Sequence, residues 1–189
     1  MSGLAAFDLS VVQALADMRT PVLVDSFSLI TDLGDISAVV VAMILIAIGF
    51  WHHGKRHYVF GLFVSVIGGC AAGYVLKGLL MRARPPVEIQ AILESGYSLP
   101  SNHSVASIVL YGFLIYLAWK ICTPVWRIVL TGVLAGLIAL IGFSRVLLGV
   151  HYPTDVIAGY AIGAIFLTIG ILVSERSGGE KQSSTEDRL

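Results

Sequence analysis

The sequence predicts an all-α integral membrane protein, a helical bundle of five transmembrane helices with an N-terminal interfacial helical segment. Composition gives the first indication: 57% of the 189 residues are hydrophobic and 13% are charged, whereas a soluble domain is nearer half apolar and a quarter charged. Five apolar runs give the second, because each approaches the roughly 20 residues that a helix needs to cross a bilayer. The formal net charge is zero, so no nucleic-acid partner is expected.

Residues 1–32 are predicted to form the interfacial amphipathic segment. Four charged residues interrupt residues 4–31: Asp8, Asp17, Arg19 and Asp25. A charge at the centre of a membrane helix costs about 2.5–3.5 kcal/mol, which argues against a span. One helical face carries its apolar residues: Phe7, Val11, Ala14, Leu15 and Met18. Such a helix lies in the interface, and Pro21 then marks a break before a second short helix from Val22 towards Ile30.

Residues 33–173 are predicted to form one transmembrane domain. Its spans are expected at Leu33–Trp51, Tyr58–Leu80, His103–Ile121, Val125–Phe143 and Thr154–Val173. Residues 174–189 are polar, mixed in charge and free of apolar periodicity, which predicts a disordered cytoplasmic tail. The first ten residues carry no basic n-region, so no cleavable signal peptide is expected.

The distribution of basic residues predicts the orientation. With five spans, the N-terminal segment and the loops 81–102 and 144–153 share one side, and the other connections share the opposite side with the tail. Seven of the twelve lysines and arginines fall on the side of the tail. The positive-inside rule therefore places the tail in the cytoplasm. We expect a multi-pass protein of the cell (inner) membrane whose outer loops face the extracytoplasmic side.

Three polar motifs interrupt the apolar sequence, and all are predicted on that outer side. They read Lys77-x6-Arg84-Pro85, then Pro100-Ser101-Asn102-His103, then Ser144-Arg145-x5-His151-x3-Asp155. Ionisable side chains at membrane depth are costly, so their presence indicates a functional site.

The first motif pairs a lysine with an arginine. Lys77 and Arg84 are seven residues apart, which is about two turns or 10 Å on a helix that the prolines after Arg84 would stop. An ammonium point charge and a bidentate guanidinium suit a phosphate group. The alternative is that both are interfacial cations that reach towards water. For Arg82 we prefer this alternative.

The second motif introduces a helix N-terminus. Pro100 and the small polar residues after it predict a turn into the third span, where free backbone N–H groups favour an anion. Ser101 could donate its hydroxyl, and His103 is placed to protonate a leaving oxygen. The alternative is simple N-capping by Ser101 or Asn102 beside an incidental histidine.

The third motif combines a histidine with a carboxylate. His151 precedes Pro153, which suits a first helical turn, and Asp155 follows within reach of the imidazole. A carboxylate on one ring nitrogen fixes the tautomer and leaves the other nitrogen as a nucleophile or base. Arg145 can reach the same pocket. The alternative is a capping aspartate with a hydrogen-bonded interfacial histidine.

A metal site would use some of the same side chains. His103, His151 and Asp155 could form a set of two histidines and one carboxylate for a metal ion. The lysine and two arginines of the motifs would repel a divalent cation and attract an oxyanion. We therefore expect a phosphate site, without a metal or other cofactor.

In residue type, order and spacing, the three motifs resemble the type-2 phosphatidic acid phosphatase superfamily, and the resemblance covers residues 33–173. That superfamily includes phosphatidylglycerophosphatases, undecaprenyl-diphosphate phosphatases, glucose-6-phosphatase and soluble vanadium haloperoxidases. The resemblance implies that His151 is the nucleophile of a phosphohistidine intermediate, oriented by Asp155, and that His103 is the acid and later the base. It implies a phosphate cradle formed by Lys77, Arg84, Ser101, the backbone amide of Asn102, and Arg145.

Two departures accompany the resemblance. Asn102 stands where the family usually has glycine, although asparagine tolerates left-handed backbone better than most residues. Membrane members commonly have six spans, whereas this chain is expected to have five, with its N-terminus outside.

The function expected from the motifs is that of a membrane phosphatase. It would hydrolyse the terminal phosphate of a lipid phosphate or diphosphate, such as undecaprenyl diphosphate, phosphatidylglycerol phosphate or phosphatidic acid. One alternative is phosphoryl transfer to a lipid or sugar acceptor by the same residues. Another is a non-enzymatic lipid transporter or scramblase. The expected partners are the lipid substrate and the bilayer.

Overall fold

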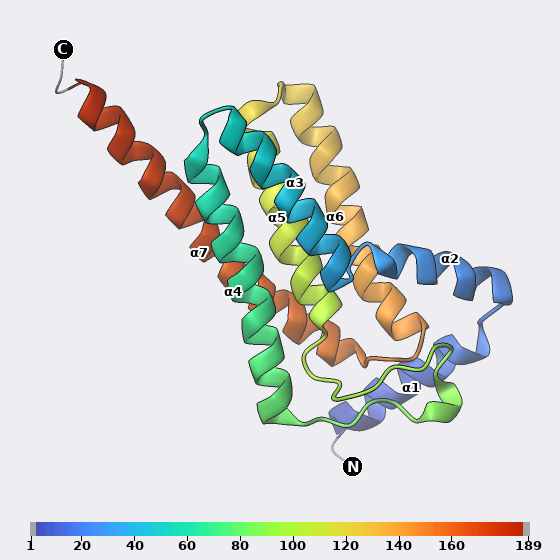
Figure 1. Cartoon of the computed structure of the whole chain (residues 1–189). Helices are drawn as coiled ribbons and strands as arrows, with labels where there is room; N and C mark the ends of the chain where they lie inside the picture. The colour runs from blue at the N-terminus through green and yellow to red at the C-terminus, as the bar shows by residue number, and fades with distance from the viewer. Residues whose placement is uncertain (1–2, 187–189) are drawn as a thin grey trace.

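The fold is entirely helical in the part of the chain described by the computed structural model, which is residues 3–186, with side chains to residue 178. Figure 1 labels the helices in chain order. They are α1 (Gly3–Asp17), α2 (Pro21–Asp32), α3 (Ile36–His52), α4 (Arg56–Leu80), the 3-10 helix η1 (Val87–Ile89), α5 (Asn102–Ile121), α6 (Pro124–Leu147) and α7 (Pro153–Glu186).

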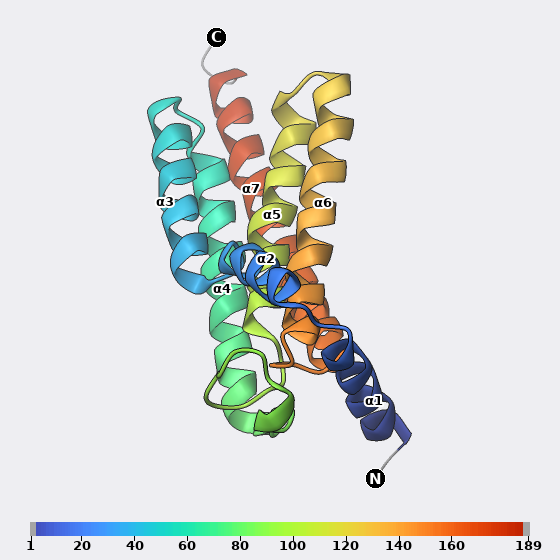
Figure 2. The same ribbon diagram turned by 90° about the vertical axis from the view of Figure 1, so that its right-hand side faces the viewer.

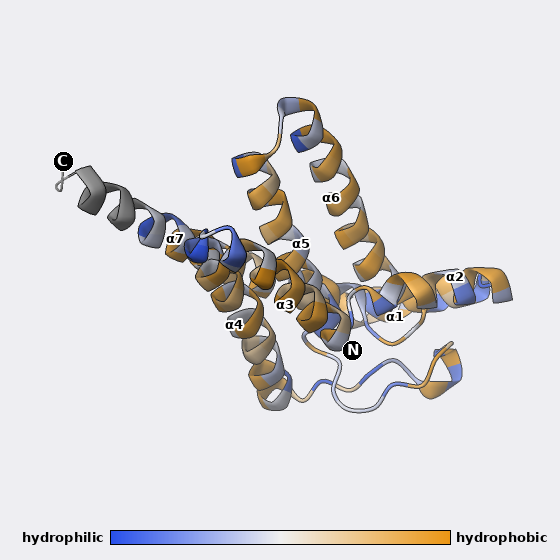
Figure 3. Cartoon of the chain, turned by 45° about the horizontal axis from the view of Figure 1, so that its top comes forward, coloured by the Kyte–Doolittle hydropathy of each residue, from blue (hydrophilic) through white to orange (hydrophobic). Residues whose placement is uncertain are grey.

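Within the described residues, four helices are each long and apolar enough to cross a membrane: α4, α5, α6 and α7. The shorter α3 meets this description together with α2, from which it is bent by 42°. The predicted class, an all-α multi-pass membrane protein, is therefore confirmed, with four or five crossings. Apolar residues dominate these helices in Figure 3, as the lipid environment requires.

The bundle is organised around α5, half of whose most apolar stretch is buried. α7 packs against α4 and α5, and α6 packs against α5. Where α4 crosses α7, a Cβ atom added to Gly61 would lie 2.5 Å from the carbonyl oxygen of Gly170, so only glycine permits the close approach. This crossing fixes the position of α7, the helix that carries Asp155.

The two N-terminal helices lie near one end of the bundle, as Figures 1 and 2 show. The Thr20 side chain caps α2 by accepting a hydrogen bond from the Leu23 amide, and Pro21 occupies the first turn. The break at Pro21 and the second short helix agree with the prediction. On α1, the Val12 side chain is buried against α6 and α7, whereas Phe7 is exposed, as is Met18 directly after the helix.

The helix α4 ends at Leu80, as the predicted span Tyr58–Leu80 does, but the first motif does not continue along this helix as expected. We expected the helix to reach Arg84, but it ends at Leu80 because Met81 adopts a left-handed conformation (φ 43°) and its amide bonds to the Lys77 carbonyl. Arg84 therefore lies on the loop 82–101, which folds across the end of the bundle (Figure 1).

The tail also differs from the prediction. We expected disorder from Ser174 onward, but α7 continues to Glu186; residues 187–189 lie outside the described part. Contacts explain the first added turn: Ser174 is buried, and the Glu175 carboxylate accepts a hydrogen bond from the Tyr116 hydroxyl at 2.8 Å. Glu175 also pairs with Lys120 at 2.6 Å.

Candidate active site

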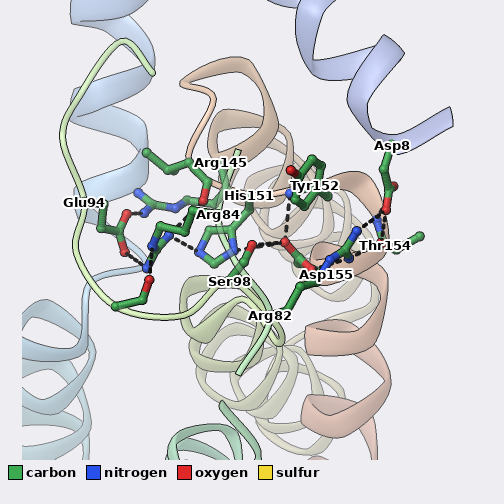
Figure 4. A network of polar contacts seen from close by, with 12 residues as sticks. Asp8, Arg82, Arg84, Glu94, Ser98, Arg145, His151, Tyr152, Thr154 and Asp155 are labelled. Atoms are coloured by element: carbon green, nitrogen blue, oxygen red, sulfur yellow. Dashed lines mark hydrogen bonds and ion pairs between the residues drawn. The ribbon is translucent and has the colours of Figure 1, made fainter. Parts of the chain in front are cut away.

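The three motifs meet at the end of the bundle that also carries α1. The loop 82–101, the turn before α7 and the N-termini of α5 and α7 come together there (Figure 1). Figure 4 shows the polar network that results. Side chains from stretches more than 60 residues apart in sequence thus form one cluster.

Asp155 is held at the start of α7 by several donors. It is the third residue of the helix, and its Oδ2 accepts a hydrogen bond from the Tyr152 amide at 2.9 Å, which caps the helix. The Ser98 hydroxyl donates to the same oxygen. Arg82 Nη1 donates to Oδ1 at 2.7 Å. The helix dipole also favours a carboxylate at this position. Asp155 is therefore fixed as an ionised acceptor.

The imidazole of His151 is buried between Asp155 and Arg84. Its Nδ1 lies 3.5 Å from Asp155 Oδ2, and its Nε2 lies 3.2 Å from Arg84 Nη1. A guanidinium can only donate, so Nε2 accepts and the ring proton sits on Nδ1, towards the carboxylate. Burial and the nearby cations lower the pKa of His151 to about 3, although Asp155 opposes the shift. The ring is therefore neutral, with the Nε2 lone pair directed at the arginine side.

Arg84 reaches His151 from the loop. Nη1 also donates to the Val150 carbonyl at 2.8 Å, and Nε donates to the Gly96 carbonyl at 3.2 Å. Burial lowers the pKa of Arg84, but a guanidinium stays protonated in proteins. These contacts place a fixed positive charge beside Nε2.

Glu94 joins two of the predicted phosphate ligands. Its carboxylate accepts hydrogen bonds from Arg84 Nη2 at 3.0 Å and from Arg145 Nη2 (Figure 4). Arg145 is almost completely buried, and its Nη1 donates to the Thr31 hydroxyl at 3.0 Å. The two guanidinium groups thus share one oxyanion next to the imidazole.

The second motif is attached to the third through the backbone. The Ser101 amide donates to the Asp155 carbonyl at 3.0 Å, which fixes the start of α5 against α7. A Cβ atom on Gly159 would lie 2.6 Å from the Ser101 carbonyl oxygen, so the approach requires glycine. The buried Ser101 Oγ and Asn102 Oδ1 have no hydrogen-bond partner within the described residues.

A cavity of about 440 Å³ adjoins the polar network. Lys77, Arg84, Asn102 and His103 all line it, together with Glu94. Its other walls come from the start of α3 and from the part of α4 around Tyr74. A larger cavity of about 720 Å³, mostly apolar, lies between α3, α5 and α6, and none of the predicted site residues lines it.

The prediction for Arg82 was wrong. We expected an interfacial cation, but its guanidinium bridges Asp155 and Asp8 with two contacts of 2.7 Å. Spacing could not reveal this, because α4 ends before Arg82 and the loop turns the side chain inward.

Further polar residues of the cluster were not predicted, among them Asp8, Glu94 and Ser98. A usable signal was the excess of cations over acids in the three motifs, since buried cations need partners. The loop 82–101 carries two acids, Glu88 and Glu94. Only the contact with Arg145, from a distant part of the sequence, identifies Glu94 as the one in the site.

A membrane-embedded helical bundle with a buried histidine–aspartate pair beside clustered arginines defines the class of the protein. Residues 55–178 match the family model described as the PAP2 superfamily. The chain belongs to the PAP2 superfamily, a family of metal-independent phosphatases that includes named phosphatases of lipid phosphates.

Several curated proteins are similar in sequence. Phosphatidylglycerophosphatase B of Bacillus subtilis is 31% identical over 162 residues, covering 84% of this chain and 78% of that protein. The decaprenylphosphoryl-5-phosphoribose phosphatase of Mycobacterium tuberculosis is 34% identical, covering 60% of this chain and 58% of that protein. The undecaprenyl-diphosphatase of Sulfolobus acidocaldarius is 32% identical, with 58% and 53% covered.

Solved structures share the fold. The crystal structure of a transmembrane PAP2 type phosphatidylglycerolphosphate phosphatase from Bacillus subtilis matches with a TM-score of 0.86 at 24% identity, covering 93% of this chain and 88% of that one. Aquifex aeolicus LpxE matches with a TM-score of 0.68 at 21% identity, covering 87% and 94%.

Proposed function

We propose that the chain removes the terminal phosphate from a lipid phosphate or diphosphate through a phosphohistidine intermediate. The observation that carries the proposal is the position of His151 Nε2, 3.2 Å from an arginine that shares an oxyanion with a second arginine. A neutral imidazole nitrogen beside an oxyanion site is arranged for attack on a phosphoryl group.

The proposed reaction has two steps. In the first, Nε2 of His151 bonds to phosphorus, the bond to the leaving oxygen breaks, and His103 gives that oxygen a proton. Asp155 faces Nδ1–H and stabilises the positive charge that develops on the ring. In the second step, His103 takes a proton from water, the hydroxide attacks phosphorus, and the N–P electron pair returns to Nε2. Inorganic phosphate leaves.

The proposed phosphate cradle combines two cations that line the cavity, Lys77 and Arg84, with Arg145, which shares Glu94 with Arg84. Lys77, Arg84 and Arg145 would neutralise the equatorial oxygens, with the Ser101 hydroxyl and the Asn102 amide at the N-terminus of α5. The unpaired Ser101 Oγ supports this role, because a buried donor without a partner is costly. In this arrangement, the Glu94 carboxylate occupies the place of phosphate oxygens and must leave when substrate binds.

The shape of the cavity supports a lipid substrate. Its walls include Ile36 on α3 and Tyr74 on α4 beside the charged residues, so an apolar chain can lie between the two helices while the phosphate reaches Arg84. Undecaprenyl diphosphate, phosphatidylglycerol phosphate and phosphatidic acid are the candidate substrates. The proposed site faces the extracytoplasmic side of the inner membrane.

Phosphate release tests the proposal. Purified protein is given each of the three lipid phosphates in EDTA, with and without vanadate, which mimics the five-coordinate transition state. We expect metal-independent release, inhibition by vanadate, and loss of release in His151→Ala. An absolute need for added divalent metal, or full activity of His151→Ala, would contradict it.

A further inference from the structure

Asp8 is a fully buried carboxylate on the N-terminal helix, outside the three motifs. It accepts hydrogen bonds from Arg82 Nη2 at 2.7 Å and from the Thr154 amide at 3.2 Å, and the Thr154 hydroxyl also donates to it (Figure 4). Burying a carboxylate is unfavourable unless it is paired and hydrogen-bonded. These contacts of Asp8 are with Thr154 on α7 and with Arg82, which also binds Asp155 on α7.

Arg82 connects Asp8 to Asp155. Its Nη1 donates to Asp155 Oδ1 and to the Thr154 hydroxyl, each at 2.7 Å, while Nη2 is held by Asp8. The guanidinium also lies over the Tyr152 ring, 4.3 Å from its centroid. One face and both terminal nitrogens of the guanidinium are thereby held, which keeps Nη1 directed at Asp155 Oδ1.

The charges explain why a second carboxylate is useful. One guanidinium between two carboxylates leaves a net charge of −1 in the cluster. If Asp8 carried no charge, Arg82 would pair with Asp155 alone and would weaken the attraction between the Asp155 carboxylate and the His151 ring. With Asp8 ionised, Asp155 keeps negative charge for the imidazole ring, whose Nδ1 lies 3.5 Å from Oδ2. Charged hydrogen bonds are strong enough for this competition to matter.

We propose that Asp8 is a positioning residue for His151, acting through Arg82 and Asp155. The N-terminal helix α1 is thus part of the catalytic apparatus as well as a surface element. The inference rests on the proposed function, because it concerns the step in which the imidazole becomes positively charged.

A merely structural role would have a different signature. If Asp8 only anchored α1, its loss would lower the amount of folded enzyme, and the remaining folded molecules would keep their kcat. A positioning role lowers kcat in the folded enzyme and leaves KM nearly unchanged, because Asp8 does not contact the cavity that receives substrate.

The test compares Asp8→Asn with Asp17→Asn, an exposed acid on the same helix. Full-length protein is purified, its melting temperature recorded, and kcat and KM measured on a lipid phosphate that the unaltered protein hydrolyses. At metal sites, losing the partner that orients a liganding histidine costs about 10- to 100-fold in activity, and we use this range for the partner of Asp155. We expect a fall in kcat of that size for Asp8→Asn, with KM within about twofold, and no change for Asp17→Asn.

An Arg82→Ala background tests the route. Because Asp8 acts through Arg82, adding Asp8→Asn there should change kcat by less than about twofold, which is the non-additivity expected of coupled residues. If the double variant lost activity by the product of the two single-variant losses in kcat, the proposal would be overturned. An unchanged kcat in Asp8→Asn alone would also overturn it.

Thr154→Val covers the case in which Asp8→Asn does not fold. It removes the hydroxyl between Asp8 and Arg82 without changing any charge. We expect a fall in kcat at constant KM, and equality with the unaltered protein would overturn the inference. Absence of phosphate release from the unaltered protein is a separate outcome, which would refute the proposed function instead.

Discussion

At the residue scale, His151 combines deep burial with three nearby cations, and both keep its ring neutral. Its pKa falls to about 3 from the usual 6.5. A neutral Nε2 is needed for nucleophilic attack, so the environment that makes the ring hard to protonate also keeps it reactive.

The same shift predicts how stability depends on pH. Between pH 6.5 and 3, the unfolded chain binds a proton at His151 that the folded chain does not, so this residue destabilises the fold progressively as pH falls through that window. Above pH 6.5 the ring is neutral in both the folded and the unfolded chain, so this loss of stability is absent there. We expect His151→Gln to lose less melting temperature than the unaltered protein between pH 7 and pH 4.5, measured in detergent. An equal or larger loss would contradict a lowered pKa.

Removing the negative charge of Glu94 should increase the affinity of the site for anions. The Glu94 carboxylate competes for Arg84 and Arg145, so Glu94→Gln should bind vanadate more tightly, by about tenfold, which corresponds to about 1.4 kcal/mol. Inhibition of phosphate release by graded vanadate measures the effect. Glu88→Gln, an exposed acid on the same loop, is the control and should match the unaltered protein. Unchanged or weaker inhibition of Glu94→Gln would show that the carboxylate does not hold the place of phosphate.

The residues of the site differ in how far the sequence predicted them. The motifs identified residues whose types are unusual in apolar helices, and these lie together around one cavity and one network. Arg82 was misjudged, and Glu94 and Asp8 were missed. The roles of Arg82 and Glu94 depend on the path of the loop 82–101, and Asp8 lies on a helix more than 70 residues before Arg82. Local spacing carries no information about such contacts.

At the element scale, the site depends on the approach of α7 to the start of α5. A Cβ atom on Gly159 would lie 2.6 Å from a backbone oxygen, which cannot move as a side-chain end can. We expect Gly159→Ala to destabilise the protein by about 1–3 kcal/mol, as overpacking does, and to lower phosphate release.

The control for this prediction is Gly132→Ala on α6, where an added Cβ meets no atom within 4 Å. Thermal unfolding in detergent should show no loss there, because alanine favours a helix more than glycine does. Equal melting temperatures for the two variants would refute the packing argument.

Helices with strong apolar patterns were predicted well, and their ends less well. The break at Pro21 follows from the chemistry of proline. In contrast, the end of α4 depends on the left-handed backbone of Met81, and the extension of α7 depends partly on contacts of Glu175 with α5. Neither residue type signals its conformation in the sequence.

At the scale of the whole molecule, the number of crossings decides which sides the termini occupy. If α3 crosses together with the other four helices, the two ends of the chain lie on opposite sides of the membrane; four crossings would place them on the same side. We expect an outward N-terminus and a cytoplasmic tail. Reporters active on only one side, fused to residue 1 and to residue 189, measure this. A cytoplasmic signal from the fusion at residue 1 would refute the orientation.

The central claim, that one imidazole carries the phosphoryl group, is tested most directly by trapping the intermediate. A lipid with a labelled terminal phosphate is mixed with the enzyme, quenched in alkali within milliseconds and analysed by peptide mass spectrometry. The account predicts an acid-labile phosphate on His151 that is absent from His151→Ala. In His103→Ala the first step is slower, and the phosphate accumulates on His151 during a longer reaction because the base of the second step is missing. Label released as inorganic phosphate without ever appearing on this histidine would contradict it.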